Sequence, residues 1–181
     1  MMRRSVNHDD ALGVWVSNWY ATAFRTACLI LQNRSDAEEA VQEAFLRAWR
    51  FRDAMPAGDA ARSWLYRVVV NTCLSKLRRR RETVAIFPEA GDDRPLLSDG
   101  DVESLVLVNE RAELVGAALA RLPDHLRVVT VLRYYAGLSE AEIATAIRRR
   151  PGTVKSRLHE ARRRLGDDKE LASLAQDREA T

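Results

Sequence analysis

The sequence predicts an all-α fold in which two small helical domains are joined by a flexible acidic linker. Apolar residues recur at helical spacing on both sides of residues 82–103, and no segment shows a convincing alternation of period two. Charge divides the chain at the same places: residues 1–81 carry 14 basic and 8 acidic side chains, residues 82–103 carry 1 and 7, and residues 104–181 carry 14 and 11. We therefore expect domains at 1–81 and 104–168, a linker at 82–103 and a polar tail at 169–181. Fully extended, such a linker reaches on the order of 70 Å, so the domains are expected to engage sites tens of Å apart.

Composition excludes several classes of protein before any motif is considered. The 181 residues are 46% hydrophobic and 30% charged, which is typical of a soluble domain. No apolar run reaches the roughly 18 residues of a membrane-spanning helix, and polar residues follow Arg3 and Arg4 where a signal peptide has its apolar core. We expect a cytoplasmic protein without membrane insertion. Cys28 and Cys73 lack companions at metal-ligand spacing, so we expect reduced, half-buried thiols, no metal site and no cofactor.

Three helices are predicted in the first domain, over residues 9–31, 35–51 and 60–80. The second begins with Ser35 and Glu38, which have the spacing of a capping box. Its apolar stripe runs from Ala40 to Trp49. The other flanks of this helix carry Glu39, Gln42, Glu43 and Leu46. Periodicity alone leaves two interpretations of these flanks, a solvated face or a binding surface.

The helix predicted over residues 60–80 has an apolar side and a basic side. The apolar side includes Trp64, which we expect to pack in the core rather than to stack on a base. The basic side comprises Arg62, Arg67, Asn71, Lys76, Arg78 and Arg79. Cations near a helix C-terminus are favoured by the helix dipole, which explains part of this run without any ligand. Cations beside aromatic residues are also typical of surfaces that bind phosphates and unstacked bases.

The second domain is predicted to hold a long helix over residues 102–121 and three shorter helices. Pro123 suits a first helical position and Gly137 the residue after a helix end, and Ser139 with Glu142 forms a second capping box. A short turn then leads to Pro151 and a basic amphipathic helix, which together indicate a helix-turn-helix. Residues 148–164 hold eight basic side chains and one acidic one, a density that favours contact with phosphates.

Two strings in this sequence carry a resemblance to a known family. The string DAEEAVQEAFLRAW, followed by SWLYRVVVNTCLSKLRRRR, resembles the promoter-melting module of bacterial RNA polymerase sigma factors of the extracytoplasmic-function (ECF) group of the sigma-70 family. The string GLSEAEIATAIRRRPGTVKSRLHEARRRL resembles the module of the same family that reads the -35 element. The resemblance implies a sigma factor without catalytic activity that binds the β and β′ subunits of core RNA polymerase, recognises promoter DNA and helps to melt it. An anti-sigma factor is a further partner that it implies.

The resemblance also implies roles for individual residues. Glu39, Gln42, Glu43 and Leu46 would dock on the clamp helices of the β′ subunit. Asn71 and the basic side chains of the helix over 60–80 would contact the -10 element, with the loop over 53–60 near a flipped base. The side chains that would face the -35 element are Arg149, Arg150, Thr153, Lys155, Ser156, Arg157, His159 and Glu160.

The turn before Pro151 departs from the family pattern. Where the family has Gly, an apolar residue and then Pro or Ser, this chain has Arg148, Arg149 and Arg150. Either Arg148 takes a positive φ, at a cost of about 1 kcal/mol or more, or the turn differs locally. Arg150 has no side-chain oxygen to cap the next helix. Glu160 also departs, since the family commonly has a basic residue there, and it either reads a base or pairs with Arg163 or Arg164 in its own helix.

Two other functions compete with this interpretation. A regulator that binds duplex DNA through the helix-turn-helix alone leaves residues 35–51 unexplained. A nucleic-acid-modifying or RNA-binding enzyme finds little support, because the sequence has no phosphate-binding Gly loop, no metal-ligand cluster and no nucleophile beside a base.

Overall fold

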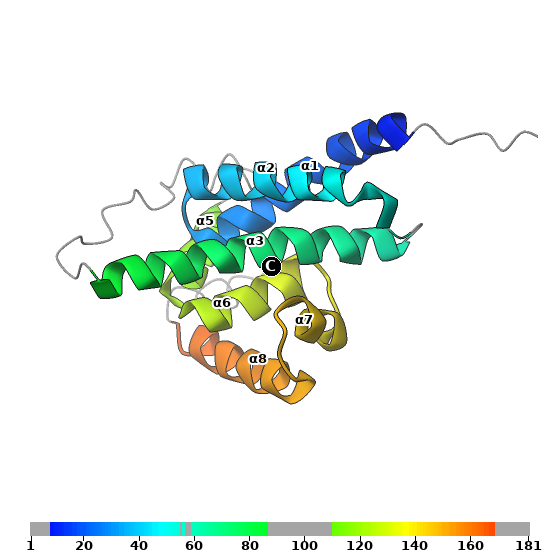
Figure 1. Cartoon of the computed structure of the whole chain (residues 1–181). Helices are drawn as coiled ribbons and strands as arrows, with labels where there is room; N and C mark the ends of the chain where they lie inside the picture. Colours follow the sequence, from blue (N-terminus) through cyan, green and yellow to red (C-terminus); the bar gives the residue numbers. More distant parts are fainter. Residues whose placement is uncertain (1–7, 55, 57–58, 87–109, 169–181) are drawn as a thin grey trace, which may run out of the picture.

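The computed structural model describes residues 8–54, 56, 59–86 and 110–168, and within these ranges the chain is helical and contains no strand. The first part of the chain forms α1 (His8–Leu31), α2 (Arg34–Arg50), the 3-10 turn η1 (Arg52–Ala54) and α3 (Asp59–Ile86). The second part forms α5 (Glu110–Arg121), α6 (Asp124–Thr130), the π-helical turn η2 (Val131–Tyr135), α7 (Glu140–Ala146) and α8 (Pro151–Gly166). The predicted all-α class is confirmed (Figure 1). No helix in the described ranges combines the length and the apolar character needed to cross a bilayer.

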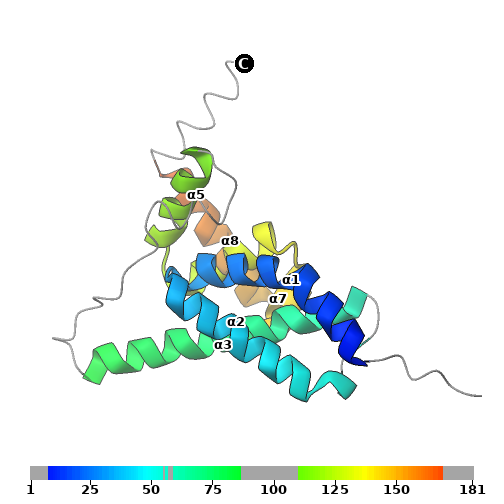
Figure 2. The same ribbon diagram turned by 90° about the horizontal axis from the view of Figure 1, so that it is seen from above.

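The first part is a three-helix unit in which α2 contacts both α1 and α3 (Figure 2). The buried face of α2 is built mainly from small residues, namely Ala37, Ala40, Val41, Ala44 and Ala48. Small side chains let helix axes approach closely. Trp64 is partly buried against the core, as predicted. The opposite face of α2 is therefore left outside the unit.

The start of α2 differs from the prediction. Asn33, not Ser35, is the N-cap: its backbone is extended, and its side-chain oxygen accepts a hydrogen bond of 2.8 Å from the Asp36 N–H. Gln32 takes a positive φ of 54° at the end of α1, which turns the chain into this position. Asn is as good a cap as Ser, so the capping box expected at Ser35 was wrong and the helix begins one residue earlier.

The boundaries of the predicted linker also change. Helix α3 continues to Ile86, so the first residues assigned to the linker are helical. Helix α5 begins at Glu110, and the predicted helical residues 102–109 lie outside the described ranges. The rest of the linker and the tail over 169–181 lie outside them as well.

The local signals in the helix-turn-helix are largely confirmed. Ser139 and Glu142 form the predicted capping box at the start of α7. Gly137 has a positive φ of 71°, as expected for a residue that follows a helix end, and Pro151 stands in the first turn of α8. Pro123 is the exception, because it is the N-cap of α6 and not its first helical residue.

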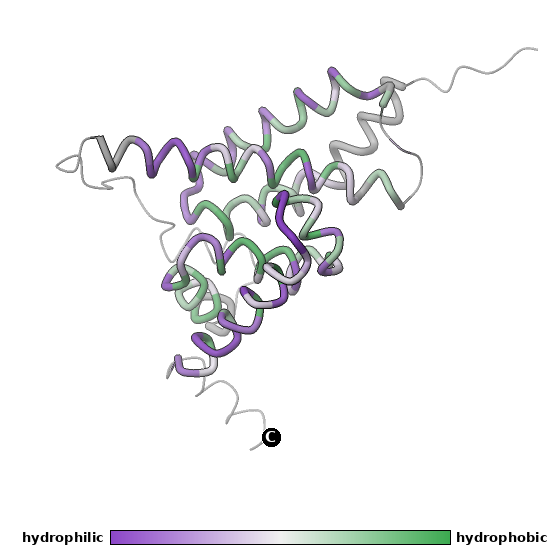
Figure 3. The backbone as a smooth tube through the Cα atoms, turned by 60° about the horizontal axis from the view of Figure 1, so that its bottom comes forward, coloured by the Kyte–Doolittle hydropathy of each residue, from purple (hydrophilic) through white to green (hydrophobic). Residues whose placement is uncertain are grey.

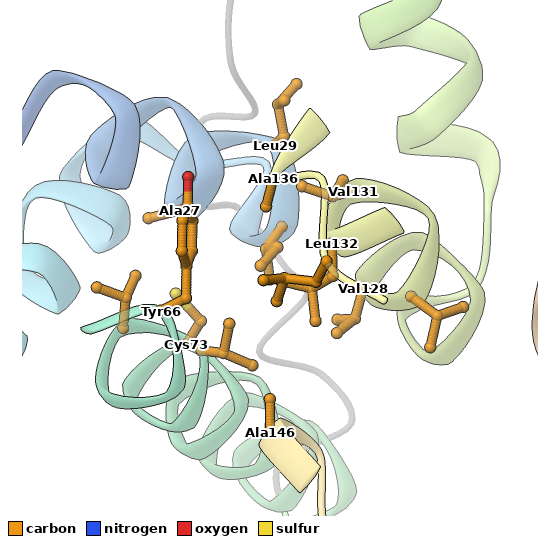
Figure 4. Close-up of a cluster of buried hydrophobic side chains, with 14 of the residues drawn as sticks. Ala27, Leu29, Tyr66, Cys73, Val128, Val131, Leu132, Ala136 and Ala146 are labelled. Carbon is orange, nitrogen blue, oxygen red and sulfur yellow. The ribbon is translucent and has the colours of Figure 1, made fainter. Parts of the chain in front are cut away.

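The two parts of the chain pack against each other and share one buried core. Helix α1 contacts η2, α5 and α6, and α3 contacts α7; we call this junction the seam. Figure 4 shows Ala27, Tyr66 and Cys73 of the first part facing Leu132 and Val128 of the second. The structure therefore differs from the separated arrangement that the linker length allows. Cys28 and Cys73 are free thiols, and both are fully buried instead of half-buried as expected.

A buried arginine crosses the seam. Arg127 of α6 is 5% exposed, and its Nε donates a hydrogen bond of 2.9 Å to the carbonyl oxygen of Ile30, in the last turn of α1. Its Nη1 donates at 2.9 Å to the carbonyl of Leu122, and its Nη2 lies 2.6 Å from the Asp124 carboxylate. A cation is favoured at a helix C-terminus, where carbonyl groups lack partners in the helix. The second part of the chain thus supplies a hydrogen-bond donor to a carbonyl group at the end of α1.

Two further polar contacts join α3 to the second part. Arg81 lies 2.8 Å from the carboxylate of Asp124, and the Ser63 hydroxyl donates a hydrogen bond to the carboxylate of Glu142. The same Glu142 side chain completes the capping box of α7. The seam therefore combines apolar burial with specific polar contacts.

Candidate nucleic-acid and protein interfaces

The outward face of α2 carries a contiguous group of exposed side chains. Glu39, Gln42, Glu43 and Leu46 follow one another at spacings of three, one and three residues, so they lie on one side of the helix. Leu46 is 63% exposed. Glu43 pairs with Arg47, and Glu39 lies 2.8 Å from Lys76 of α3. A contiguous exposed apolar patch with a polar rim marks a surface that binds another protein, and Leu46 is one member of such a group.

Two aromatic residues extend this surface, and the sequence argument missed them. Trp49 was placed in the apolar stripe of α2, but it is 38% exposed, and the guanidinium of Arg52 lies over its ring at 4.8 Å. Phe51, the C-cap of α2, is 62% exposed. Aromatic residues are enriched at protein interfaces. The α2 surface, as we call it, therefore comprises Glu39, Gln42, Glu43, Leu46, Trp49 and Phe51.

The predicted -10 residues of α3 do not form one face. Lys76 has only 14% of its side chain exposed and is held between α2 and α3 by Asp36, at 4.0 Å, and by Glu39. Arg67 is half-buried beside α7, where it lines a pocket together with Ser63 and Glu142. The structure thus assigns Lys76 to packing within the first part and turns Arg67 toward the second part.

The other predicted -10 residues of α3 differ in how far their side chains are exposed. Asn71 is half-buried, whereas Arg78 and Arg79 are exposed near the C-terminal end of α3. The backbone of Arg62 lies in α3, but its side chain is outside the described atoms, and residues 55, 57 and 58 of the loop over 53–60 lie outside the described ranges. The structure therefore brings Arg67 and Arg78 to the seam side of α3 and leaves Arg79 in solvent.

Val154, Leu158 and Ala161 form the buried side of α8, and its exposed side is polar. Figure 3 shows hydrophilic and hydrophobic residues alternating along the helices of the chain. Lys155, Ser156 and His159 are exposed, and their spacing places them together on the outward face. Arg149 and Arg150 are exposed in the turn, Thr153 is half-buried, and Arg157 is half-buried on the flank that faces α3. The helix-turn-helix therefore presents a polar face of the kind that enters a major groove.

Arg148 takes a positive φ, which is one of the two alternatives that the departure from the family pattern left open. Its φ is 52°, and the neighbouring Arg149 N–H donates to the Ala144 carbonyl at 2.9 Å, which closes the end of α7. Arg150 is the N-cap of α8 and makes no side-chain cap bond. The chain thus keeps the backbone geometry of a tight turn although no glycine is present there.

Glu160 is paired within its own helix. Its carboxylate lies 2.8 Å from Nη2 of Arg163 and 2.7 Å from Nε of Arg164. These two hydrogen bonds lower the pKa of Glu160 to about 2. The sequence left open whether Glu160 reads a base or pairs within its helix, and the structure contains the intrahelical pair. In the described residues, no group of His, Cys, Asp and Glu side chains is arranged to hold a metal ion.

Comparison with known proteins matches both parts of the chain to one family. Residues 15–83 match Sigma-70 region 2, and residues 112–165 match Sigma-70, region 4. The chain is 36% identical over 134 residues to the ECF RNA polymerase sigma-E factor of Escherichia coli (strain K12), covering 70% of each chain. It is 29% identical over 163 residues to the ECF RNA polymerase sigma factor SigW of Bacillus subtilis (strain 168), covering 86% of this chain and 85% of SigW.

The fold is also found in solved structures. One is the sigma factor RpoE of Bartonella quintana in complex with the anti-sigma factor NepR, with a TM-score of 0.66, 24% identity and coverage of 84% of this chain and 94% of that one. Another is CnrH in complex with the cytosolic domain of CnrY, with a TM-score of 0.57, 21% identity and coverage of 93% and 90%. A regulator with a helix-turn-helix alone does not account for the match to region 2. The chain belongs to the ECF group of the sigma-70 family, and its function is that of a sigma factor in promoter-specific transcription initiation by RNA polymerase.

Proposed function

We propose that this sigma factor docks on core RNA polymerase through the α2 surface and acts in the cytoplasm as a specificity subunit, while the polymerase carries out the chemistry. The observation that carries the docking role is Leu46, which is 63% exposed in the centre of a helix face. Burying an apolar side chain of this size stabilises an interface by about 1.5–3 kcal/mol. The paired acidic residues beside it supply charge complementarity to a basic partner surface.

We also assign the two DNA-contacting surfaces. Asn71 and the basic residues of α3 other than Lys76, with the loop over 53–60, serve the -10 strand, and Lys155, Ser156 and His159 of α8 meet base edges of the -35 element. Arg149 and Arg150 contact phosphates from the turn. Base contacts discriminate between sequences, whereas phosphate contacts set affinity and salt dependence. The pairing of Glu160 with Arg163 and Arg164 argues for a supporting role at that position over direct base reading.

The packed arrangement bears on when these surfaces are available. Arg67 is half-buried in a pocket against the second part of the chain, so a promoter strand reaches it after the seam opens. We infer that promoter binding requires separation of the two parts. The two solved relatives are each bound to a second protein, an anti-sigma factor in the case of RpoE, which supports an anti-sigma factor as the regulator of this chain too.

The docking role is tested by Leu46→Glu, with Val115→Glu as the matched control. Val115 is a 45% exposed apolar residue of α5 in the second part of the chain. We expect Leu46→Glu to weaken binding to core polymerase at least tenfold in a titration followed by fluorescence anisotropy, and Val115→Glu to leave it near wild type. Equal core affinity for both variants, with unchanged helical circular dichroism, contradicts the docking assignment.

The two DNA roles are separated by a second pair of variants. Arg149→Ala should weaken binding to all -35 sequences alike and reduce the slope of log K against log salt by roughly one unit. Asn71→Ala should reduce open-complex formation while leaving the closed complex intact, because a flipped base is read in a pocket. Loss of only some -35 sequences in Arg149→Ala, or equal loss of both complexes in Asn71→Ala, contradicts the respective assignment.

A further inference from the structure

A pocket of about 320 Å³ lies in the seam, lined by α3, α6 and the helix-turn-helix. Its basic side chains come from both parts of the chain. Arg78 and Arg81 belong to α3, His125 to α6, Arg149 to the turn and Arg157 to α8. Because neither part carries the whole set, this seam pocket exists as a unit only while the two parts are packed together.

Carboxylates of the described residues balance only part of the positive charge of the seam pocket. Asp124 is the acidic side chain among its lining residues, and it is already shared by Arg81, at 2.8 Å, and the buried Arg127, at 2.6 Å. Among the residues that the structure describes, Arg78 and the two arginines of the helix-turn-helix have no carboxylate within ion-pair distance. Folding has therefore assembled several cations around a single, fully engaged anion.

Loss of hydration and, after it, repulsion from neighbouring cations lower the pKa values of two of these side chains. Partial loss of hydration, and then the nearby Arg149, lower the pKa of Arg157. Partial loss of hydration lowers the pKa of His125 as well, followed by the charges of Arg157, Arg81 and Arg164. A lowered pKa of a cation means that its surroundings disfavour positive charge. A bound anion offsets that penalty, because an opposite charge nearby favours the charged form of a cation.

The size and floor of the seam pocket indicate the kind of anion. A volume of about 320 Å³ is at the lower end of the range for small-molecule sites, roughly 300–1,000 Å³. Leu74, Leu77, Val128 and Ile147 give it an apolar floor beneath the charged rim. Guanidinium groups bind phosphate oxygens in pairs of parallel hydrogen bonds. The site therefore fits a compact ligand that carries several phosphates.

We propose that the seam pocket binds a small polyphosphate anion, held by Arg78 from one part of the chain and by Arg149 and Arg157 from the other. Inorganic polyphosphate and nucleoside polyphosphates share this chemistry, and the apolar floor offers the latter a place for a base or a ribose. The ligand bridges the seam and stabilises the packed arrangement. The bound anion competes with promoter DNA, and this competition rests on the proposed function, in which Arg149 contacts phosphates of the -35 element; the family resemblance implies a -35 role for Arg157 as well.

Isothermal titration calorimetry of the full chain tests this with two probes, inorganic tripolyphosphate and ATP, in magnesium-free buffer. Sodium sulfate at matched ionic strength is the reference. We expect saturable binding of one anion per chain, and none with sulfate. Equal affinity for the two probes indicates that the site recognises the phosphates alone. Tighter binding of ATP indicates that its base or ribose also contacts the apolar floor. Either result supports the site.

Variants on both sides of the seam locate the site. Arg78→Gln and Arg157→Gln should each weaken binding by about tenfold, the loss expected for one charge-assisted contact. Arg162→Gln, which makes the same charge change at an exposed position of α8 outside the pocket, should leave it unchanged. Circular dichroism confirms that each variant is folded. Leu46→Glu, the test of polymerase docking, should bind the anion like wild type, so the two proposals fail separately.

Three results overturn the proposal. The first is the absence of saturable binding for both probes. The second is equal weakening by Arg162→Gln and Arg157→Gln, which indicates diffuse attraction to a basic surface. The third is weakening by Arg157→Gln but not by Arg78→Gln, which places the anion on the helix-turn-helix and outside the seam.

Discussion

Replacing Arg127 with Met tests whether the seam couples the stability of the two parts. The substitution keeps an unbranched apolar stem in the core and removes the guanidinium donors. The carbonyl groups of Ile30 and Leu122 then lose partners at 2.9 Å each, and both residues are buried. Leaving a buried acceptor unsatisfied costs about 1–3 kcal/mol, so two of them cost about 2–6 kcal/mol.

Two effects reduce this cost. Burial lowers the pKa of Arg127, which shows that its charge is poorly hydrated in the fold, and removing that charge recovers part of the desolvation penalty. Asp124 is not left alone, because Arg81 remains 2.8 Å away. We therefore expect Arg127→Met to reduce the free energy of unfolding by about 2–4 kcal/mol.

The assay uses the distribution of tryptophan. All 4 Trp residues lie in the first part of the chain, between Trp15 and Trp64, whereas Arg127 lies in the second. Urea unfolding followed by Trp fluorescence thus reports on the part that does not contain the substitution. With a slope of about 2 kcal/mol per M, the fluorescence midpoint should fall by about 1–2 M.

Arg81→Ala is the matched control, because Arg81 contacts the same Asp124 carboxylate but has 63% of its side chain exposed. An exposed ion pair contributes at most about 1 kcal/mol, so the midpoint should move little. A fluorescence midpoint for Arg127→Met within the range of Arg81→Ala refutes the coupling, even if the circular dichroism transition of the second part shifts.

Three further predictions follow from local contacts. Asn33→Ala should destabilise the fold by about 1 kcal/mol through loss of the α2 cap, while Ser35→Ala should change the unfolding free energy by under about 0.5 kcal/mol; equal losses in urea unfolding refute the cap assignment. The Glu160 carboxyl should titrate near its pKa of about 2 when followed by carbon NMR, so the stability it contributes is present above its ordinary value near 4.5 and is lost as the pH falls toward 2; a midpoint near 4.5 refutes its pairing. Burial raises the pKa of Cys73 to about 12, and Cys28 is also buried, so neither thiol should react with a disulfide reagent at pH 8 until urea unfolds the chain.

Helical periodicity was enough to predict the fold class, because each helix buries one stripe whatever it packs against. The outward residues Gln42 and Leu46 were found in this way, and the cap at Ser139 was found from local spacing. Trp49 shows the limit of the method. It continues the apolar stripe of α2, yet it stands in the last turn of the helix and remains 38% exposed. Periodicity gives the side of a helix but not how far its neighbours extend along it.

The seam was beyond sequence reasoning for a different reason. Arg127 stands in the apolar string from Leu126 to Val131, and its partner at Ile30 is a backbone carbonyl 97 positions away. Every residue has a backbone carbonyl, so the residue type at the acceptor position does not reveal this contact. The linker composition indicated a connecting segment, although its first residues proved to be the end of α3, and it carried no information on whether the joined parts would pack together. The packing comes from apolar side chains that the sequence pattern assigns to the separate core of each part.

The arrangement gives Arg149 and Arg157 two exclusive environments, the seam pocket and the promoter. In the packed state both line the pocket with Arg78, whereas in the proposed contact with the -35 element they face DNA. A ligand shifts such an equilibrium only by its difference in affinity for the two states. An anion held by arginines from both parts binds the packed state more tightly than the separated state, because separation leaves it with at most two of the three guanidiniums. Because only separated molecules bind the promoter, the apparent promoter affinity falls as the fraction of packed molecules rises. The basic charge of the helix-turn-helix thus contributes to DNA affinity in the open state and, through a bridging anion, to inhibition in the packed one.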